Sequence, residues 1–391
     1  MALGLRPLWC LAIAAMVVRT AGAGPAAGAA SLWDPATPFP LGGEIQSVPG
    51  VRFKLVQAQT PAYRFLHETR LAVHGGRLFV SFSNAPKNES EPAQVIRGRT
   101  SRDGGVTWSE PAVWAGGLAG GERYETAPMV STEGRLYAFV GRYRLGGRSS
   151  LGMEVHRYNE STQRFELLAE SGLTPNFIPF VQPQKLANGN WIIGGHADEV
   201  SSAAVAISDG PDLTRWRVVR IRTPAGSFYP ETALLIAGGD VTAVTRNDKS
   251  DRRALVAVSH DYGETFSAAV PADFPMSDSK PFAGTLSTGQ RYLIFNGYPN
   301  RNADGSRNRS DLLIAVTKPG EATPLRKTWR IISDLPGGME ILSPEEASRP
   351  DRQSWAYPEA AEHDGTLYVV FSHNKKHGWL AAIPVESLRR P

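Results

Sequence analysis

The sequence is almost without cysteine, which removes one common source of stability. Its single cysteine, Cys10, lies in an apolar stretch near the N-terminus, so no intrachain disulfide framework is available. Charge of one sign is not in large excess either: 42 Lys and Arg stand against 38 Asp and Glu, with no run of five or more basic residues. We therefore expect no nucleic-acid partner and no basic membrane-binding stretch, although the arginine content suits an anionic small substrate.

Long hydrophobic runs are also missing. The apolar stretch from Leu8 to Val18 is too short for a membrane-spanning helix, and nothing later in the chain is long enough. Arg6 before this stretch and the small residues Ala21 to Ala23 after it are typical of a secretory signal. We expect an exported protein, secreted or periplasmic. The predicted parts are a signal peptide over residues 1–23, a flexible lead-in rich in Ala, Gly and Pro over 24–45, and one folded domain over 46–391.

What the sequence does have is a recurring glycine-centred turn followed by a strand pattern. The residues after each turn are rich in β-branched and aromatic types, and no long stretch has sustained helical spacing. A repeat of roughly 50 residues built only from strands is typical of a propeller blade. We predict an all-β fold, a six-bladed β-propeller with four-stranded antiparallel blades. The turns fall at Gly76, Gly134, Gly189, Gly239, Gly289 and Gly365.

Two motifs of the form Ser-x-Asp-x-Gly-x-Thr-aromatic follow predicted third strands. They are Ser101 to Trp108 and Ser259 to Phe266, and Ser208 to Trp216 is a degenerate third copy. In such a turn the Asp carboxylate accepts backbone N–H groups, Gly takes a positive φ, and the aromatic ring packs between neighbouring sheets. We interpret these motifs, called Asp-boxes below, as structural turns at one end of the propeller.

The opposite end of the propeller is expected to carry the functional residues. Strands alternate in direction within a blade, so the first strand begins at the end where the second strand stops and the third begins. Arg70 is an alternative to Arg64 at this rim, and Arg307 is an alternative to Arg309. The rim candidates are Arg64, Glu231 and Tyr357 from the starts of first strands, Arg246 from the end of a second strand and Arg309 from the start of a third.

The Asp-boxes and these five residues make the chain resemble the sialidases, a family of six-bladed propellers. Sialidases hold the carboxylate of their substrate with three arginines, and Arg64, Arg246 and Arg309 stand on the corresponding blades and strands. The resemblance implies that these three bind a carboxylate bidentately, that Tyr357 is the nucleophile and that Glu231 is its base. A neutral phenol suits such a site, because a carboxylate nucleophile would be repelled by the charge on the substrate.

One departure from the sialidase pattern concerns the acid/base residue. Sialidases place an Asp shortly before the first Asp-box, whereas here no Asp occurs between Asn84 and Asp103 and Gln94 stands in that neighbourhood. Acid catalysis is then either absent or provided from another position. The candidates for such a replacement are Glu91, Glu125 and Asp198.

A second departure concerns the Glu that supports the first arginine of a sialidase, late in the last blade. Ser372 or His373 occupies that region here. Glu359 lies two residues after Tyr357 on the same strand face, so it is a further candidate to contact the ligand or an arginine.

The sequence thus predicts an exported, retaining sialidase-like glycosidase that removes a terminal acidic sugar of the sialic acid class from glycans. Two alternatives remain: a glycosidase or lyase of the same fold that acts on a different acidic sugar, and a propeller that binds acidic glycans without turnover. The histidines show no metal-ligand spacing, and we expect neither a metal nor a cofactor.

Overall fold

A computed structural model describes residues 31–40, 42–118, 121–144, 150–168, 172–248, 253–297, 309–333 and 353–389. The predicted signal peptide, residues 1–23, lies outside this range. In the part of the chain that the structure describes, no helix combines the length and apolarity needed to cross a bilayer.

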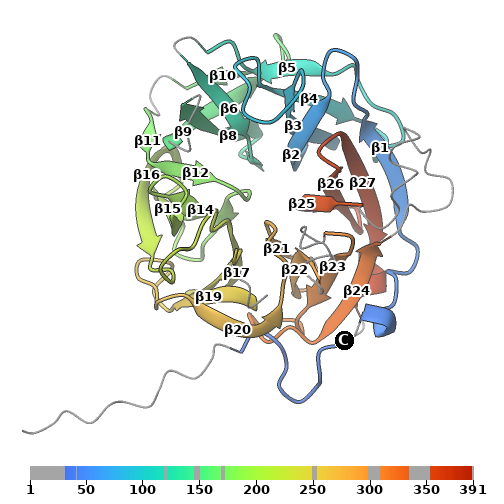
Figure 1. Cartoon of the computed structure of the whole chain (residues 1–391), viewed down its shortest axis with the longest axis vertical. Helices are drawn as coiled ribbons and strands as arrows, with labels where there is room; N and C mark the ends of the chain where they lie inside the picture. Colours follow the sequence, from blue (N-terminus) through green and yellow to red (C-terminus); the bar gives the residue numbers. More distant parts are fainter. Residues whose placement is uncertain are drawn as a thin grey trace, which may run out of the picture.

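Six antiparallel sheets stand around a central axis, which confirms the predicted six-bladed β-propeller (Figure 1). The first three blades, each listed from the axis outwards, are β2 (Phe65–His74), β3 (Arg77–Ala85), β4 (Val95–Ser101) and β5 (Ala112–Ala115); β6 (Glu122–Thr126) with β7 (Met129–Thr132), β8 (Arg135–Arg144), β9 (Ser150–Asn159) and β10 (Arg164–Leu167), where β11 (Thr174–Pro175) also pairs with β9; and β12 (Phe177–Pro179) with β13 (Gln184–Lys185), β14 (Trp191–Ala197), β15 (Ser202–Asp209) and β16 (Asp212–Ile221).

The other three blades follow the same order. They are β17 (Thr232–Ala237), β18 (Asp240–Thr245), β19 (Arg253–Ser259) and β20 (Val270–Pro275); β21 (Phe282–Thr285), β22 (Arg291–Asn296), β23 (Leu312–Val316) and β24 (Lys327–Ile332); and β25 (Trp355–His363), β26 (Thr366–His373), β27 (His377–Pro384) and β1 (Arg52–Gln57). Short 3₁₀ turns cover Gly42–Glu44 and Val385–Leu388.

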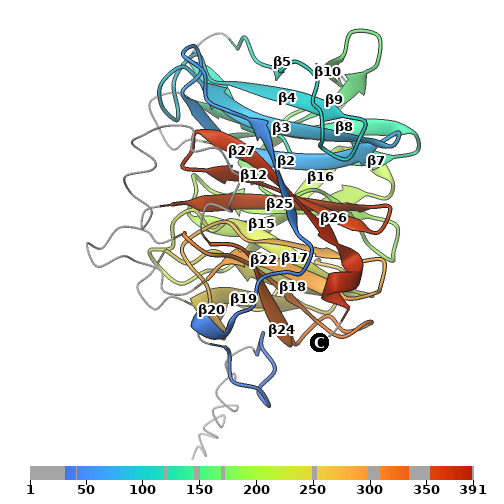
Figure 2. The ribbon, with the colours of Figure 1, turned by 90° about the vertical axis from the view of Figure 1, so that its right-hand side faces the viewer.

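The ring is closed by a strand from the start of the described chain. β1 forms the outer strand of the last blade by pairing with β27, and the register joins Arg52 to Ala382 and Leu55 to Trp379. Figure 1 labels β1 beside β27, and Figure 2 shows the same side of the ring facing the viewer. This pairing covers the outer edge of β27, which would otherwise present unpaired backbone groups.

Leu32 and Trp33 are anchored on the propeller, although they lie within the stretch 24–45 that the sequence predicted to be a flexible lead-in. Leu32 and Trp33 are buried in the core that they share with blades four and five. The Leu32 N–H donates to Oδ1 of Asp273 at 2.9 Å, and Trp33 bridges to Leu325. Burial of apolar side chains and a paired backbone together fix this segment.

The Asp-boxes have the geometry expected of structural turns. In the first copy, the Asp103 carboxylate accepts the Ser101 hydroxyl at 2.8 Å, the Thr107 N–H at 2.9 Å and the Thr107 hydroxyl at 2.6 Å. The same bonds recur around Asp261 at 2.7, 2.9 and 2.6 Å. Gly105 has φ +87°, and a Cβ there would lie 2.3 Å from Leu380 of the neighbouring blade.

Candidate active site

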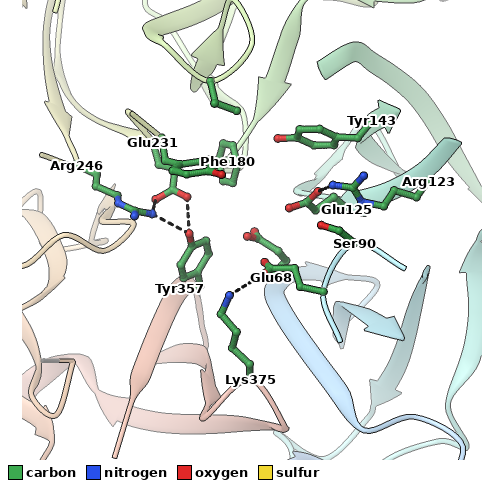
Figure 3. Close-up of a pocket in the computed structure, with 13 residues that line it drawn as sticks. Glu68, Ser90, Arg123, Glu125, Tyr143, Phe180, Glu231, Arg246, Tyr357 and Lys375 are labelled. Carbon is green, nitrogen blue, oxygen red and sulfur yellow. Dashed lines mark hydrogen bonds and ion pairs between the residues drawn. The ribbon is translucent and has the colours of Figure 1, made fainter. Parts of the chain in front are cut away.

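A pocket of about 230 Å³ lies at the end of the propeller opposite the Asp-boxes, where the inner strands β2 and β25 begin. Figure 3 shows its acidic, basic and aromatic side chains converging from several blades. The residues that line it are Glu68, Glu89, Ser90, Arg123, Glu125, Tyr143, Phe180, Val200, Tyr229, Glu231, Arg246, Tyr357 and Lys375.

Tyr357, Glu231 and Arg246 form a bonded group in this pocket. The phenol of Tyr357 donates to Oε1 of Glu231 at 2.5 Å, and Nη1 of Arg246 donates to Oε2 of Glu231 at 3.0 Å and to the phenol oxygen at 3.1 Å (Figure 3). All three side chains are buried. A carboxylate that accepts from a phenol and is held by a guanidinium is arranged to take a proton from that phenol.

The strand register explains why Glu231 and Arg246 meet. β17 and β18 form a hairpin in which Thr232 pairs with Thr245, and the Arg246 N–H donates to the Glu231 carbonyl at 3.0 Å. Glu231 and Arg246 therefore lie opposite each other one position beyond the last strand pair, where opposite charges on facing residues stabilise the hairpin.

Tyr357 reaches the pocket through a bulge in its strand. The pairing of β25 with β26 breaks between Ala356 and Glu359, and Tyr357 has φ +59°. A bulge redirects a side chain locally, and a non-glycine residue in the left-handed region needs support from its surroundings. The Thr69 hydroxyl gives such support by donating to the Tyr357 carbonyl at 3.2 Å.

The protonation states in this group follow from burial and charge. Burial alone would raise the pKa of Glu231, but the charge of Arg246 and the hydrogen bond from Tyr357 overcome it and hold that pKa below its ordinary value. Burial, and then the negative charge of Glu231, raise the pKa of Tyr357 well above its ordinary value. The resting pair is thus a neutral phenol and an ionised carboxylate.

The three predicted arginines are not brought together in one cluster. Arg246 lines the pocket. The Arg309 guanidinium lies 5.6 Å from the ring centroid of Tyr357, and its Nη2 donates to the Asp278 carbonyl at 2.8 Å. Arg64 precedes β2 with an exposed side chain outside the pocket, and its N–H donates to the Pro86 carbonyl at 3.1 Å.

Arg70, the alternative to Arg64, is fully buried and pairs with Glu68, which lines the pocket. It forms ion pairs with Glu68 and, at 3.6 Å, with Glu359, and its Nε donates to the Thr126 hydroxyl at 3.0 Å. Glu359 is fully buried and lies 3.8 Å from Nζ of Lys280, and burial raises the pKa of Glu359 to about 7. Glu359 therefore contacts an arginine, as one of its two predicted roles requires, but it does not line the pocket.

Of the predicted acid/base candidates, only Glu125 lines the pocket. It forms an ion pair with Arg123 at 2.9 Å, and burial raises its pKa to about 7. Glu91 instead accepts the N–H groups of Lys87 and Asn88, both at 3.1 Å, and so closes its own turn.

Gln94 and Asp198 also lie outside the lining. Gln94 is buried behind it, where its Nε2 donates to the Tyr124 carbonyl at 3.0 Å and its Oε1 accepts the N–H of Ser90 at 2.8 Å. Asp198 holds Arg220 through two bonds of 2.7 and 2.8 Å. Gln94 thus positions a lining residue, and Asp198 belongs to a separate surface ion pair. Within the described ranges, no group of three or more His, Cys, Asp or Glu side chains is placed to hold a metal ion.

Comparison with protein families gives a match to the BNR repeat-like domain over residues 169–369, about half of the chain. The chain belongs to the BNR repeat-like domain family. Together with the six blades, this membership places it in the superfamily of sialidase-type β-propellers. No protein with a curated description matches its sequence.

Solved structures share the fold of this BNR repeat-like propeller at low sequence identity. A protein of unknown function from Dyadobacter fermentans aligns with a TM-score of 0.64 and 16% identity, over 86% of this chain and 100% of its own. Trypanosoma rangeli sialidase in complex with the inhibitor DANA aligns with a TM-score of 0.63 and 15% identity, over 88% of this chain and 61% of its own. NanB sialidase from Streptococcus pneumoniae aligns with a TM-score of 0.57 and 13% identity, over 89% of this chain and 72% of its own. The chain spans about three-fifths of the T. rangeli protein, and the likeness shows the fold alone.

Sequence reasoning missed several pocket residues of this BNR repeat-like propeller, notably Glu68, Tyr143 and Lys375. One signal pointed to Glu68: residues 67–70 are four consecutive polar residues, His-Glu-Thr-Arg, inside an otherwise apolar inner strand. Strict alternation directs every second side chain of a strand to the same face, so a polar run of this kind indicates a break in the register.

Proposed function

We propose that the protein is a retaining glycoside hydrolase in which Tyr357 attacks the anomeric carbon and Glu231 takes the phenol proton. The observation that carries this proposal is the 2.5 Å hydrogen bond from the Tyr357 phenol to a Glu231 carboxylate that Arg246 keeps ionised. A nucleophile with an ionised base in hydrogen-bond reach, oriented by a third group, is the general arrangement of covalent catalysis.

The reaction has two displacements. In the first, a bond forms between the Tyr357 oxygen and the anomeric carbon, the phenol proton moves to Glu231, and the leaving alcohol departs with a proton from a pocket acid. In the second, the conjugate base of that pocket acid takes a proton from water as the water oxygen attacks the same carbon, the aryl ether bond breaks, and the phenol recovers its proton from Glu231. Two inversions return the original anomeric configuration.

The substrate that fits the sequence resemblance is a terminal acidic sugar of the sialic acid class. Arg246 donates to the Tyr357 phenol and the Arg309 guanidinium lies 5.6 Å from the Tyr357 ring centroid, so a carboxylate on the reacting carbon would meet positive charge close to the nucleophile. Sialidases of this fold were solved with sialic acid and with 2,3-difluorosialic acid as a covalent intermediate. We also propose export, with cleavage of the signal peptide near residue 23, which N-terminal sequencing of the mature protein tests.

The test is covalent capture. The purified protein is assayed with aryl sialosides and a panel of other aryl glycosides, then incubated with the matching fluorinated sugar, and the labelled peptide is located by mass spectrometry. We expect turnover, label on Tyr357, and loss of both in Tyr357→Phe. Tyr262→Phe, at the Asp-box end of the propeller, is the matched control and keeps both. Binding of acidic glycans without turnover, or label on another residue, would overturn the proposal.

A further inference from the structure

Three inner strands are bulged at the point where each contributes a side chain to the pocket. Pairing breaks in β2 between His67 and Arg70, in β6 between Tyr124 and Thr126, and in β25 between Ala356 and Glu359. The bulged positions include Glu68, Glu125 and Tyr357, and all three line the pocket. Bulges of this kind redirect side chains next to active sites.

Glu68 shares a second feature with Tyr357. Glu68 has φ +53° and Tyr357 has φ +59°, so both hold a backbone conformation that costs an L-residue free energy and that concentrates at functional sites. Thr69, inside the bulge of β2, donates its hydroxyl to the carbonyl of Tyr357 at 3.2 Å. The two bulges are therefore bonded to each other, and the Glu68 side chain is placed relative to the phenol.

We propose that Glu68 is the acid/base residue of this site. This role rests on the proposed glycosidase function and adds a catalytic residue to the pair of Tyr357 and Glu231. In the first displacement, the Glu68 carboxylic acid gives its proton to the glycosidic oxygen as the bond from that oxygen to the anomeric carbon breaks. In the second, the Glu68 carboxylate takes a proton from the attacking water, which restores the acid.

The surroundings of Glu68 favour its protonated form at rest. Its side chain is 3% exposed, and burial raises its pKa to about 8. Of the charged groups that face it, Glu231 and Glu125 act in the same direction, while Arg70 and Lys280 oppose it. Glu231 in the same pocket has its pKa lowered. Two carboxyl groups whose environments push their pKa values apart are suited to act as one acid and one base.

Glu68 is distinguished by the hydrogen bond that joins its bulge to the bulge of Tyr357. Glu125 is the other carboxyl group of the pocket with a raised pKa, and like Glu68, which pairs with Arg70, it has an arginine partner. Its carboxylate is held by Arg123 at 2.9 Å, and Arg123 donates in turn to the Arg144 carbonyl at 3.0 Å. The negative charge of Glu68 contributes to the raised pKa of Tyr357, so Glu68 stands within electrostatic reach of the nucleophile. In Figure 3, Glu68 lies between Tyr357 and Glu125.

The experiment compares leaving groups in Glu68→Gln, which keeps the side-chain shape and cannot transfer a proton. Alkyl glycosides, which need protonation, are expected to lose roughly 10²–10⁴-fold in kcat/KM. Dinitrophenyl glycosides of the same sugar depart without help and are expected to lose less than about tenfold in the first displacement. Added azide replaces the base-assisted water and yields a glycosyl azide. In the wild-type enzyme kcat/KM is expected to fall at high pH as Glu68 loses its proton, and this fall is expected to be absent in Glu68→Gln.

Two variants serve as comparisons. Glu91→Gln changes a carboxylate outside the pocket and is expected to keep wild-type rates. Glu125→Gln is expected to lower the rates of both substrate classes alike and to give no azide product. If Glu68→Gln does not fold, Glu68→Asp takes its place. Its shorter side chain holds the carboxyl group farther from the glycosidic oxygen, so alkyl glycosides are again expected to lose more kcat/KM than dinitrophenyl glycosides, by a smaller factor.

The outcomes separate the two proposals. Glu68 loses this role if Glu68→Gln affects all leaving groups equally without azide product, or if Glu125→Gln shows the dependence instead. The proposed function stands in both cases, provided that Tyr357→Phe is inactive. Absence of turnover in a folded wild-type protein removes the proposed function itself, and the role of Glu68 with it.

Discussion

Nη1 of Arg246 lies 3.0 Å from Oε2 of Glu231, inside the protein and away from solvent. A buried carboxylate without such a partner takes up a proton, because desolvation penalises its charge. Arg246 also donates to the phenol of Tyr357, and its Nε is held by Asp248 at 2.6 Å. The charge of Glu231, and so its ability to accept the phenol proton, depends on this guanidinium.

Removing the guanidinium is expected to move the acidic limb of activity. The limb reports protonation of Glu231, and the wild-type pKa lies below the ordinary value of 4.5 because of Arg246. In Arg246→Gln the burial that raises this pKa is opposed only by the Tyr357 hydrogen bond and the charge of Arg309, so the limb of kcat/KM against pH shifts upwards, by about one unit or more. Arg64→Gln, with its exposed side chain, is the control and leaves the limb in place. An unshifted limb in Arg246→Gln would contradict the assignment of Glu231 as base.

Three buried carboxyl groups are expected to lower stability as the pH rises from about 5 to 7. His67 and His196, whose pKa values burial lowers, oppose this fall below about 6.5. Burial raises the pKa of Glu68 to about 8 and those of Glu125 and Glu359 to about 7, so the folded state keeps protons that the unfolded chain releases above 4.5. The stabilisation is complete below 4.5 and is lost as the pH passes the folded pKa values, at up to about 1.4 kcal/mol per pH unit for each group. Lys280, whose pKa is lowered to about 7 by burial, acts oppositely above pH 7.

Urea unfolding at several pH values checks this expectation. Glu359→Gln mimics the protonated form of one of the three groups, so its free energy of unfolding is expected to depend less steeply on pH than that of the wild-type protein. A variant with an unchanged slope would show that Glu359 is ionised in the folded state at neutral pH.

Gly105→Ala is expected to destabilise the protein more than a glycine substitution with a similar backbone conformation. Gly105 has φ +87° and its added Cβ would lie 2.3 Å from Leu380, whereas Gly134 has φ +70° and nothing within 4 Å of an added Cβ. Strain alone costs roughly 1 kcal/mol in Gly134→Ala, and overpacking adds roughly 1–3 kcal/mol in Gly105→Ala. Urea unfolding of both variants measures the difference, and equal losses would mean that the Asp-box turn does not pack tightly on the next blade.

Removing β1 is expected to expose the edge of the last blade. A chain that begins at residue 58 lacks the strand that pairs with β27, so we expect a lower melting temperature and self-association through the open edge. A chain that begins at residue 31 keeps this strand and the packed segment before it, and is the control. Size-exclusion chromatography and thermal unfolding report the two effects. A monomeric, equally stable chain from residue 58 would show that closure contributes little.

The architecture could be predicted from the sequence because its signals are local. Each glycine turn and each Asp-box is set by a few neighbouring residues, and their recurrence implies the ring. The meeting of Glu231 with Arg246 was within reach for the same reason, since one hairpin register places them side by side. The pairing of β1 with β27 could not be predicted in this way, because neither segment alone has a sequence signal for its distant partner strand.

The limit of sequence reasoning at the pocket was the bulge. The period-2 alternation of a strand assigns each side chain to one face of the sheet, and this assignment fails beyond a bulge. The break between His67 and Arg70 brings Glu68 into the pocket and Arg70 next to Glu68. Arg64, which precedes the strand, stays at the surface. The predicted carboxylate-binding set was therefore only partly assembled, and Glu68 was overlooked.

The pairing of Arg52 with Ala382 also bears on the order of events during synthesis. The ribosome synthesises β1 long before β27, so the five preceding blades can fold while the sixth still lacks its partner strand. The hydrogen bonds between β1 and β27 form only after β27 has been synthesised, and they join segments that are far apart in the sequence. Because contacts between segments far apart in the sequence form slowly, we expect ring closure to be the slow last stage of folding.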